Sequence, residues 1–108
     1  MKEMYKILLC CASGVTTNML VSSIKESAKK QEKTVMCWAV GALSIKFSWA
    51  DADCVLVAPQ SKADFQNIKD MIHDVIPCEM MKEEDFIKMD GDSLLKHAIE
   101  IIDNNRNK

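Results

Sequence analysis

Two adjacent cysteines stand where an apolar run meets a loop of small and hydroxyl-bearing residues. The stretch from 8 to 20 reads LLCCASGVTTNML and contains no charged residue. A thiolate is the reactive form of cysteine, and the positive end of a helix dipole favours the thiolate over the thiol. The stretch therefore indicates a nucleophilic cysteine at the start of a helix.

The loop after the cysteines has the composition of a phosphate-binding loop. Small residues let the backbone curl, so that successive N–H groups and the N-terminus of the next helix point at one place. Hydroxyl and amide side chains at the helix start add further hydrogen-bonding groups. The predicted phosphate-binding residues are Ala12, Ser13, Gly14, Val15, Thr16, Thr17 and Asn18. A thiol beside such a site predicts a cysteine that carries or attacks a phosphoryl group.

The position of the two cysteines relative to the loop favours Cys11 as the nucleophile. Cys10 continues the apolar strand and is expected to pack against a helix, whereas Cys11 begins the loop. Cys10 remains an alternative, and so does a purely structural role for both, because cysteine is often a small buried apolar residue. Cys37, Cys54 and Cys78 lie within predicted strands, where core packing explains them.

The loop lacks the arginine of a cysteine phosphatase. Low-molecular-weight tyrosine phosphatases end their phosphate loop with an arginine whose guanidinium binds the phosphoryl oxygens. Counted from Cys11 that position is Thr17, counted from Cys10 it is Thr16, and the only arginine is Arg106. A relay that holds phosphocysteine is therefore favoured, and a low-molecular-weight cysteine phosphatase or arsenate reductase is the alternative.

Strand-like and helix-like segments alternate along the chain. Strands are predicted at 5–11, 34–39, 54–58 and 77–81, and helices at 15–33, 62–74 and from about 94 to 102. The second helix should bury Phe65, Ile68, Met71 and Ile72. Segment 40–51 is a loop or a short helix, and Leu43, Ile45, Phe47 and Trp49 offer it side chains to bury.

Alternation with short connections implies parallel strands joined by right-handed crossovers. We therefore predict a three-layer α/β fold, flavodoxin- or Rossmann-like, with a four-stranded parallel sheet of order 2-1-3-4. Ligands of such sheets bind beyond the carboxyl ends of the strands, where the strand order reverses. That place is the end of the first strand, beside the end of the third. Pro59 and Gln60 follow the third strand and can contact the phosphate loop or a partner, although a strand-ending turn explains them too.

Length and composition fit one small globular domain over residues 1–108, with a tail at 104–108 expected to fray. The chain is 48% hydrophobic, its net charge is −2, and its lysines are scattered, which argues against a nucleic-acid-binding face. No stretch is long and apolar enough to insert in a membrane, and no signal peptide is evident. We expect a soluble, cytoplasmic protein.

The cysteine pattern argues against a disulfide framework or a metal site. The count is five, an odd number, and no CxxC pair occurs. Dispersed cysteines of this kind suit a reducing compartment. The histidines, His73 and His97, have no metal-ligand spacing and are expected at the surface or near helix ends. No cofactor and no metal are predicted.

Three blocks of the sequence resemble the IIB components of the sugar phosphotransferase system (PTS), lactose/cellobiose class, and above all the cellobiose type. The first is CASGVTTNMLV at 11–21, where Gly14, three residues after Cys11, places the register on Cys11. The second is DCVLVAPQ at 53–60, a strand that ends in Pro-Gln. The third is KMDG at 88–91 with the helix after it. The resemblance covers about residues 6–102.

This resemblance implies a phosphoryl-carrying phosphotransferase. A histidine-phosphorylated IIA protein would donate its phosphoryl group to Cys11, and phosphocysteine would pass it to a sugar bound by the membrane-embedded IIC permease. Backbone N–H groups of 12–18 would hold the phosphate, assisted by the Thr16 and Thr17 hydroxyls. The sugar would be cellobiose, another β-linked disaccharide or an aryl-β-glucoside. The protein would lie in the cytoplasm, at the inner face of the membrane when docked to IIC.

The sequence departs from the family pattern near the cysteine. Val15 stands where methionine is common, Thr16 and Asn18 replace frequent serines, and Cys10 is an unusual second thiol. A flavodoxin-like FMN electron carrier is the remaining alternative, because the segment 13–17 loosely resembles a flavodoxin phosphate loop. Flavodoxins usually flank the flavin ring with aromatic residues, for which this chain offers only Tyr5, Trp38 and Trp49.

Overall fold

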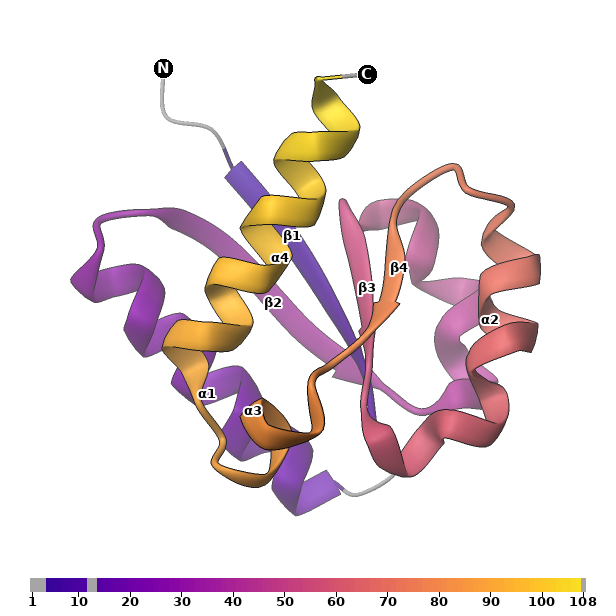
Figure 1. Cartoon of the computed structure of the whole chain (residues 1–108), viewed down its shortest axis with the longest axis horizontal. Helices are drawn as coiled ribbons and strands as arrows, with labels where there is room; N and C mark the ends of the chain where they lie inside the picture. Colours follow the sequence, from indigo (N-terminus) through magenta and orange to yellow (C-terminus); the bar gives the residue numbers. More distant parts are fainter. Residues whose placement is uncertain (1–3, 12–13, 108) are drawn as a thin grey trace.

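The computed structural model describes residues 4–11 and 14–107, with the backbone alone at 14–17. Its sheet has four strands, which are β1 (Met4–Cys10), β2 (Thr34–Val40), β3 (Cys54–Val57) and β4 (Cys78–Met80). All neighbouring strands are parallel, and their order is β2-β1-β3-β4 (Figure 1). The predicted sheet order is confirmed.

The central position of β1 follows from its apolar sequence. A strand with neighbours on both edges and helices on both faces has little contact with water, and parallel strands of this kind read as continuous apolar runs. Ile7 pairs with Cys37 on one side and with Cys54 on the other, and its exposed fraction is 0%. The register of β1 therefore brings its last residue, Cys10, level with Val40 and Val57 at the carboxyl edge of the sheet.

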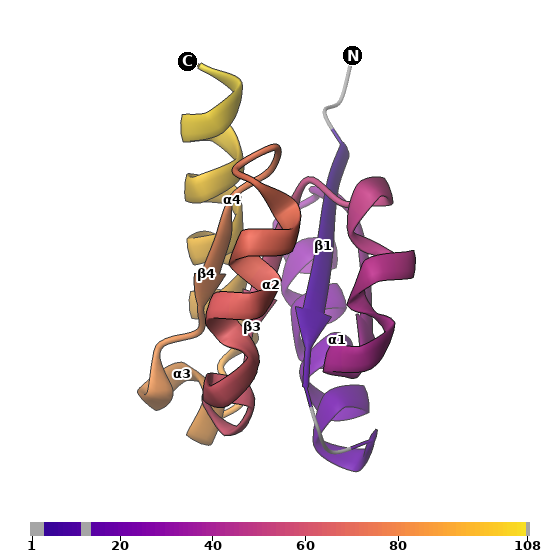
Figure 2. The same ribbon diagram turned by 90° about the vertical axis from the view of Figure 1, so that its right-hand side faces the viewer.

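Helices cover both faces of the sheet. One face packs against α1 (Gly14–Lys30) and α4 (Gly91–Arg106), through side chains such as Leu20, Ile24 and Leu95. The other face packs against α2 (Phe65–Ile72) and the 3₁₀ helices η1 (Ala42–Phe47) and η2 (Trp49–Asp51). Figure 2 shows α4 and the η1–η2 segment on opposite sides of the sheet. The three layers that the alternation predicted are thus present.

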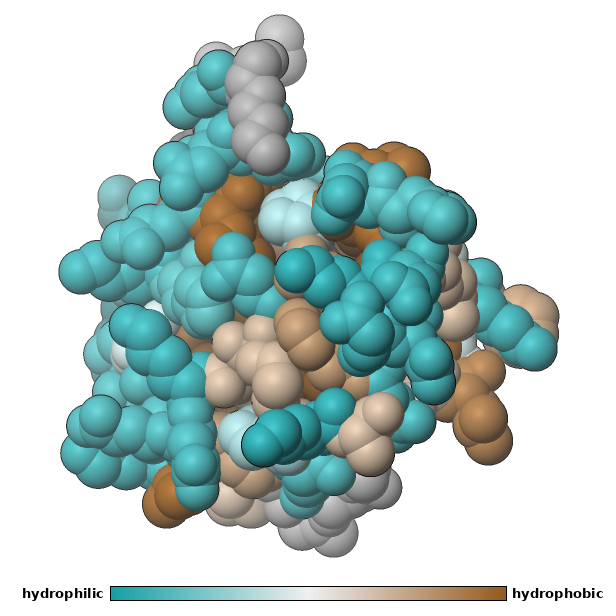
Figure 3. All heavy atoms as spheres, turned by 45° about the vertical axis from the view of Figure 1, so that its right-hand side comes forward, coloured by the Kyte–Doolittle hydropathy of each residue, from teal (hydrophilic) through white to brown (hydrophobic). Residues whose placement is uncertain are grey.

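Segment 40–51 buries less than its apolar pattern suggested. Ile45 is fully buried against the α2 face, but Leu43 and Phe47 are 90% and 77% exposed. In the tight turns of a 3₁₀ helix, side chains three positions apart share a face, so residues two before and two after Ile45 cannot also face the sheet. Figure 3 shows apolar side chains that stand out singly from a mostly hydrophilic surface.

The second predicted helix is shorter than expected. Residues Pro59–Asp64 form a further 3₁₀ helix, η3, and α2 ends where His73 adopts a left-handed conformation with a φ of 52°. Ile68 and Ile72 lie one turn apart and are buried, whereas Met71 is 36% exposed, so its predicted burial is wrong. A step of about 100° per residue turns Met71 away from the line through the two isoleucines.

Two local features differ from or refine the sequence prediction, one in region 82–90 and one at His97. A short helix, α3 (Glu83–Ile87), precedes α4, where the sequence allowed a loop or a short helical turn. His97 lies in the middle of α4, and its Nε2 is 2.9 Å from Glu79 Oε1 of β4. Its side chain is only 12% exposed, so the expected surface or helix-end position is wrong for His97.

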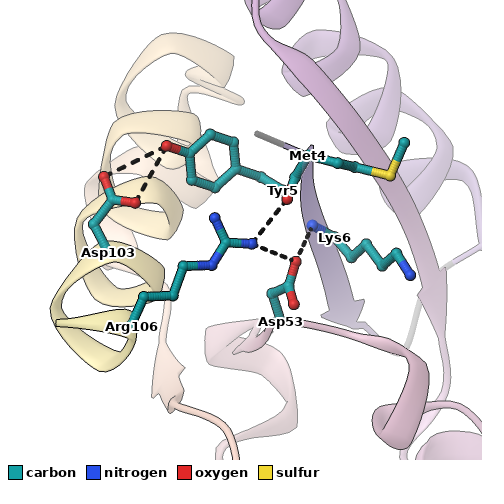
Figure 4. A network of polar contacts seen from close by, with 6 residues as sticks. All are labelled: Met4, Tyr5, Lys6, Asp53, Asp103 and Arg106. Atoms are coloured by element: carbon teal, nitrogen blue, oxygen red, sulfur yellow. Dashed lines mark hydrogen bonds and ion pairs between the residues drawn. The ribbon is translucent and has the colours of Figure 1, made fainter. Parts of the chain in front are cut away.

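The end of α4 contacts the sheet through the side chain of its last residue. The helix continues to Arg106, whose Nη2 donates hydrogen bonds to Met4 O at 2.8 Å and Asp53 Oδ2 at 3.2 Å. The guanidinium also lies over the Tyr5 ring, 5.1 Å from its centroid. The ordered helix thus includes residues 104–106 of the predicted tail, and three partners contact the Arg106 side chain (Figure 4).

Further hydrogen bonds belong to this network. The Tyr5 hydroxyl donates to Asp103 Oδ1 at 3.2 Å, and the Lys6 backbone N–H donates to Asp53 Oδ2 at 2.9 Å. Figure 4 shows that these residues come from the start of β1, the end of α4 and the residue before β3. The network closes the edge of the sheet from which β1 starts, opposite the carboxyl edge.

Candidate functional site

The first candidate residue, Cys11, lies at the carboxyl edge of the sheet between β2 and β3. Its backbone N–H donates to Val40 O at 3.2 Å, and on the other side Ala58 N–H donates to Cys10 O at 2.8 Å. These bonds extend the pairing of β1 by one residue on both sides. Because β1 has a neighbour on each side, this edge is the point at which the strand order reverses, where α/β sheets bind ligands.

The two adjacent thiols lie on opposite faces of the sheet. Cys11 belongs to the core between the sheet and helices α1 and α4, together with Leu9. Cys10 belongs to the core on the α2 face, together with Val57 and Ile68. Successive residues of a strand face opposite sides, which separates the two side chains. The pair is therefore two separate sites rather than one dithiol.

The surroundings of Cys10 keep it a neutral thiol. Burial, together with the negative charge of Asp64, raises the pKa of Cys10 to about 11, although a hydrogen bond with Ser61 acts in the opposite direction. Its exposed fraction is 0%. Since the thiolate is the nucleophile, these surroundings support the predicted packing role of Cys10. The contact with Ser61 was not predicted, although the neighbouring carboxyl ends of β1 and β3 make such a contact reasonable.

The Cys11 thiol has a polar partner at the carboxyl end of β3. Its Sγ donates a hydrogen bond to Gln60 Oε1, and the two atoms are 3.2 Å apart. Gln60 follows Pro59 at the start of η3, and its side chain is exposed, whereas Cys11 is 4% exposed. Of the two explanations considered for Gln60, contact with the candidate site and a strand-ending turn, the structure shows both.

The predicted phosphate-binding residues are only partly described. Ala12 and Ser13 lie outside the described residues. Gly14, Val15, Thr16 and Thr17 form the first turn of α1, where backbone N–H groups have no acceptor within the helix. No acidic residue lies in this turn, so no side-chain charge opposes an anion there. Asn18 follows in the second turn, with an exposed side chain.

The arginine that a cysteine phosphatase uses to bind phosphate has no counterpart at the carboxyl edge of this sheet. The chain's only arginine, Arg106, binds Met4 at the opposite end of β1. Seven steps along an extended strand lead from Met4 to Cys11, which is roughly 23 Å. The geometry therefore provides a thiol and a helix start at the carboxyl edge, without the arginine that phosphatases use to stabilise transition-state charge.

Sequence comparison relates the chain to one family over most of its length. The profile of the family described as "PTS system, Lactose/Cellobiose specific IIB subunit" matches residues 6–97. The oligo-β-mannoside-specific EIIB component of the PTS of Bacillus subtilis (strain 168) is 33% identical over 104 residues, covering 94% of this chain and 99% of that protein.

Solved structures agree with this relationship. The cellobiose-specific IIB component from Borrelia burgdorferi superposes with a TM-score of 0.82 at 29% identity, covering 95% of each chain. The lactose-specific IIB domain from Streptococcus pneumoniae has a TM-score of 0.81 at 20% identity, covering 92% of this chain and 98% of that one, and shows that the fold is shared.

None of the described helices has the length and apolar character needed to cross a membrane. The family profile begins within β1 and spans the other three strands and the helix start after Cys11, so it replaces the phosphatase and flavodoxin alternatives that the loop had left open. The chain belongs to the lactose/cellobiose-specific IIB subunits of the sugar phosphotransferase system.

Proposed function

We propose that this IIB subunit carries a phosphoryl group on Cys11 between a protein donor and a sugar. The observation that carries the proposal is the position of the Cys11 thiol, at the carboxyl edge of the sheet and just before the N-terminus of α1. In the first step, the N–P bond of a phosphohistidine breaks and an S–P bond forms. The thiol proton ends on the released imidazole, so the step needs no further reactant.

The partners are a IIA protein and a IIC permease. IIB components of the phosphotransferase system work with both in general. We propose that the phosphohistidine belongs to IIA and that phosphocysteine delivers its group to a sugar bound by the membrane-embedded IIC. The protein then works in the cytoplasm, at the inner face of the membrane while it is docked to IIC.

The phosphate site is the backbone of the loop and the first turn of α1. Backbone N–H groups of residues 12–18 hold the phosphoryl oxygens, with help from the Thr16 and Thr17 hydroxyls, because N–H groups at a helix start bind anions. The position of Arg106 at the far end of β1 supports holding over hydrolysis. A carrier gains from this arrangement, since water must not discharge phosphocysteine before the sugar arrives.

The sugar class is β-linked. The Bacillus subtilis relative is named for oligo-β-mannosides, and the Borrelia burgdorferi structure is named for cellobiose. Both are β-linked saccharides. We propose cellobiose, another β-linked oligosaccharide or an aryl-β-glucoside as the compound that is phosphorylated.

Transfer of labelled phosphate tests the proposal. The chain is incubated with a phosphorylated IIA protein and then with membranes that contain the matching IIC and one of these sugars. Wild type and Cys10→Ser should yield phosphorylated sugar, and Cys11→Ser should not. Loss of transfer in Cys10→Ser with normal transfer in Cys11→Ser would contradict the assignment. An α-linked disaccharide serves as the control for sugar class.

A further inference from the structure

We propose that Gln60 is a hydrogen-bond partner of Cys11 in both chemical states of the carrier. Its amide oxygen accepts from the resting thiol, and after phosphoryl transfer its amide nitrogen donates to the phosphocysteine. This inference rests on the proposed function of Cys11. It adds a side chain from β3's end to a site otherwise built from the β1–α1 loop.

The resting contact defines the first state. Cys11 Sγ and Gln60 Oε1 are 3.2 Å apart, and an amide oxygen can only accept a hydrogen bond. The sulfur must therefore be the donor, which requires the protonated thiol. Gln60 thus holds the side chain of Cys11 as a thiol before the phosphoryl group is transferred.

Phosphoryl transfer removes that donor. The S–H bond is replaced by an S–P bond, and the sulfur then carries a group with negatively charged oxygens. An amide oxygen that still pointed at this group would face like charge and would have no proton to accept. The carboxamide of Gln60, however, also carries two N–H donors at the same end of the side chain. A half-turn about the terminal torsion exchanges the oxygen and the nitrogen, and this torsion has broad, roughly two-fold preferences.

The backbone around Gln60 is anchored while its side chain faces solvent. Ala58 N–H donates to Cys10 O at 2.8 Å, and Ser61 N–H donates to Ala58 O at 2.9 Å. The first bond ties the residue before η3 to the end of β1, and the second closes the turn that contains Gln60. The exposed side chain can therefore reorient without unpacking any buried group, and the amide stays within reach of Cys11.

A neutral amide suits a carrier better than a charged side chain does. A guanidinium gives paired, charge-assisted hydrogen bonds to phosphate, whereas an amide gives a weaker neutral donor. The amide can hold the phosphoryl group without binding it so tightly that delivery to the sugar becomes slow. Gln60 thereby supplies a side-chain donor at the edge of the sheet that Arg106 does not reach.

NMR of the side-chain amides tests the reorientation without any mutation. The full-length chain is labelled with ¹⁵N and phosphorylated by its IIA donor. The NH₂ signals of Gln60 should shift on phosphorylation, whereas those of Gln66 should not. Gln66 is a matched control because it is a glutamine on α2 that donates to Asp70, away from Cys11. Unchanged Gln60 signals in a chain with phosphorylated Cys11 would overturn the inference and leave the proposed function standing.

Two substitutions test whether the donor matters for the phosphorylated state. Gln60→Glu keeps the shape and the acceptor but cannot donate at neutral pH, and its charge repels phosphate. Gln60→Met removes both groups with little change in volume. We expect the half-life of phosphocysteine or its equilibrium level to fall about tenfold or more in Gln60→Glu and less in Gln60→Met. Gln66→Glu and Gln66→Met should match wild type.

The ranking of the variants separates this role from a structural one. If the half-life of phosphocysteine fell equally in Gln60→Glu and Gln60→Met, and both variants also had a lower melting temperature, the role of Gln60 would be structural. That result would overturn the inference. A half-life and a level of phosphocysteine equal to those of wild type in both variants would overturn the inference too. If wild type itself forms no phosphocysteine at position 11, the proposed function fails and this inference fails with it.

Discussion

Cys10 and Cys11 are adjacent in sequence but lie in different environments. Cys10 packs on the α2 face beside Val57, and Cys11 packs on the other face with its thiol directed to Gln60. Alternation along a strand explains the separation, and the pattern of apolar residues predicted it. The sequence allowed a contact between Gln60 and the loop, but it could not show which atom of each partner meets which thiol, because both partners follow β3, about fifty positions away.

Alkylation should distinguish the two thiols. A pKa of about 11 leaves Cys10 with roughly a hundredfold less thiolate at pH 8 than a thiol with the ordinary value of 9.0. In the folded chain, iodoacetamide should therefore leave Cys10 unmodified when Cys11 is already labelled, as read by peptide mass spectrometry. The rate at Cys10 should rise about tenfold per pH unit up to about pH 11 while the fold persists.

The same reaction in denaturant is the control for alkylation, because unfolding exposes both thiols and should equalise their rates. Labelling of Cys10 in the folded chain at pH 8, as fast as in the unfolded chain, would contradict the buried position assigned to it.

At the scale of elements, α4 approaches α1 so closely that one position admits no side chain. A Cβ atom added at Gly91 would lie 2.3 Å from the backbone oxygen of Ser23 in α1. The Ser23 oxygen is a backbone atom and a Cβ is attached directly to its own backbone, so neither atom can move unless its helix moves. Gly91 is the first residue of α4, and Asp90 before it caps the helix by accepting from Ser93 N–H. Helix packing therefore explains the glycine of the KMDG block.

Gly91→Ala should destabilise the fold by about 1–3 kcal/mol, because the helices must separate to make room. The matched control is Gly41→Ala, since a Cβ there meets nothing within 4 Å and its φ is −76°. Gly41→Ala should leave the free energy of unfolding unchanged or raise it by up to about 1 kcal/mol. Urea titration of both variants measures this. Equal stabilities of the two variants would disprove the packing explanation.

The strands were easier to predict than the helix ends. Apolar and β-branched stretches placed the four strands to within one or two residues, most clearly β1 and β3, because a buried parallel strand admits few polar side chains. The end of α4 was missed, since the interactions that hold Arg106 join residues 4, 5 and 53, which no local pattern reveals. Of the site, Cys11 and the helix start at Gly14 could be predicted, but the hydrogen bond to Gln60 depends on tertiary structure.

At the scale of the whole molecule, every strand contains a buried thiol. Burial raises the pKa of Cys10 and Cys78 to about 11 and of Cys37 to about 12, and raises that of Cys54 still further. All four are neutral in the folded chain at neutral pH. They pack like small apolar core residues and are free thiols in this structure.

These thiols should make the fold sensitive to alkali. Above about pH 9 the thiols of the unfolded chain ionise while those of the folded chain stay protonated, so the unfolded chain binds fewer protons. The free energy of unfolding should then fall with rising pH, with a slope that approaches about 1.4 kcal/mol per pH unit for each buried thiol until about pH 11. Below pH 8 the four thiols should have no effect on the pH dependence.

Urea titrations between pH 8 and pH 10.5 measure this slope. Cys37→Ala is the informative variant, because it removes one of the four thiols and leaves all other ionisable groups in place. Its slope should be shallower than that of wild type by about 1.4 kcal/mol per pH unit, whatever its stability at neutral pH. Parallel curves for the two chains would show that the thiols do not cause the loss of stability.

The central claim is that Cys11, and not its neighbour, carries the phosphoryl group. Its most direct test is site mapping of the phosphorylated wild-type chain by tandem mass spectrometry, after incubation with a phosphorylated IIA protein and digestion under conditions that preserve S–P bonds. We expect one phosphoryl group per chain, bound to the sulfur of Cys11 and released by iodine. A phosphoryl group on Cys10 or on a hydroxyl of Thr16 or Thr17, with Cys11 unmodified, would contradict it.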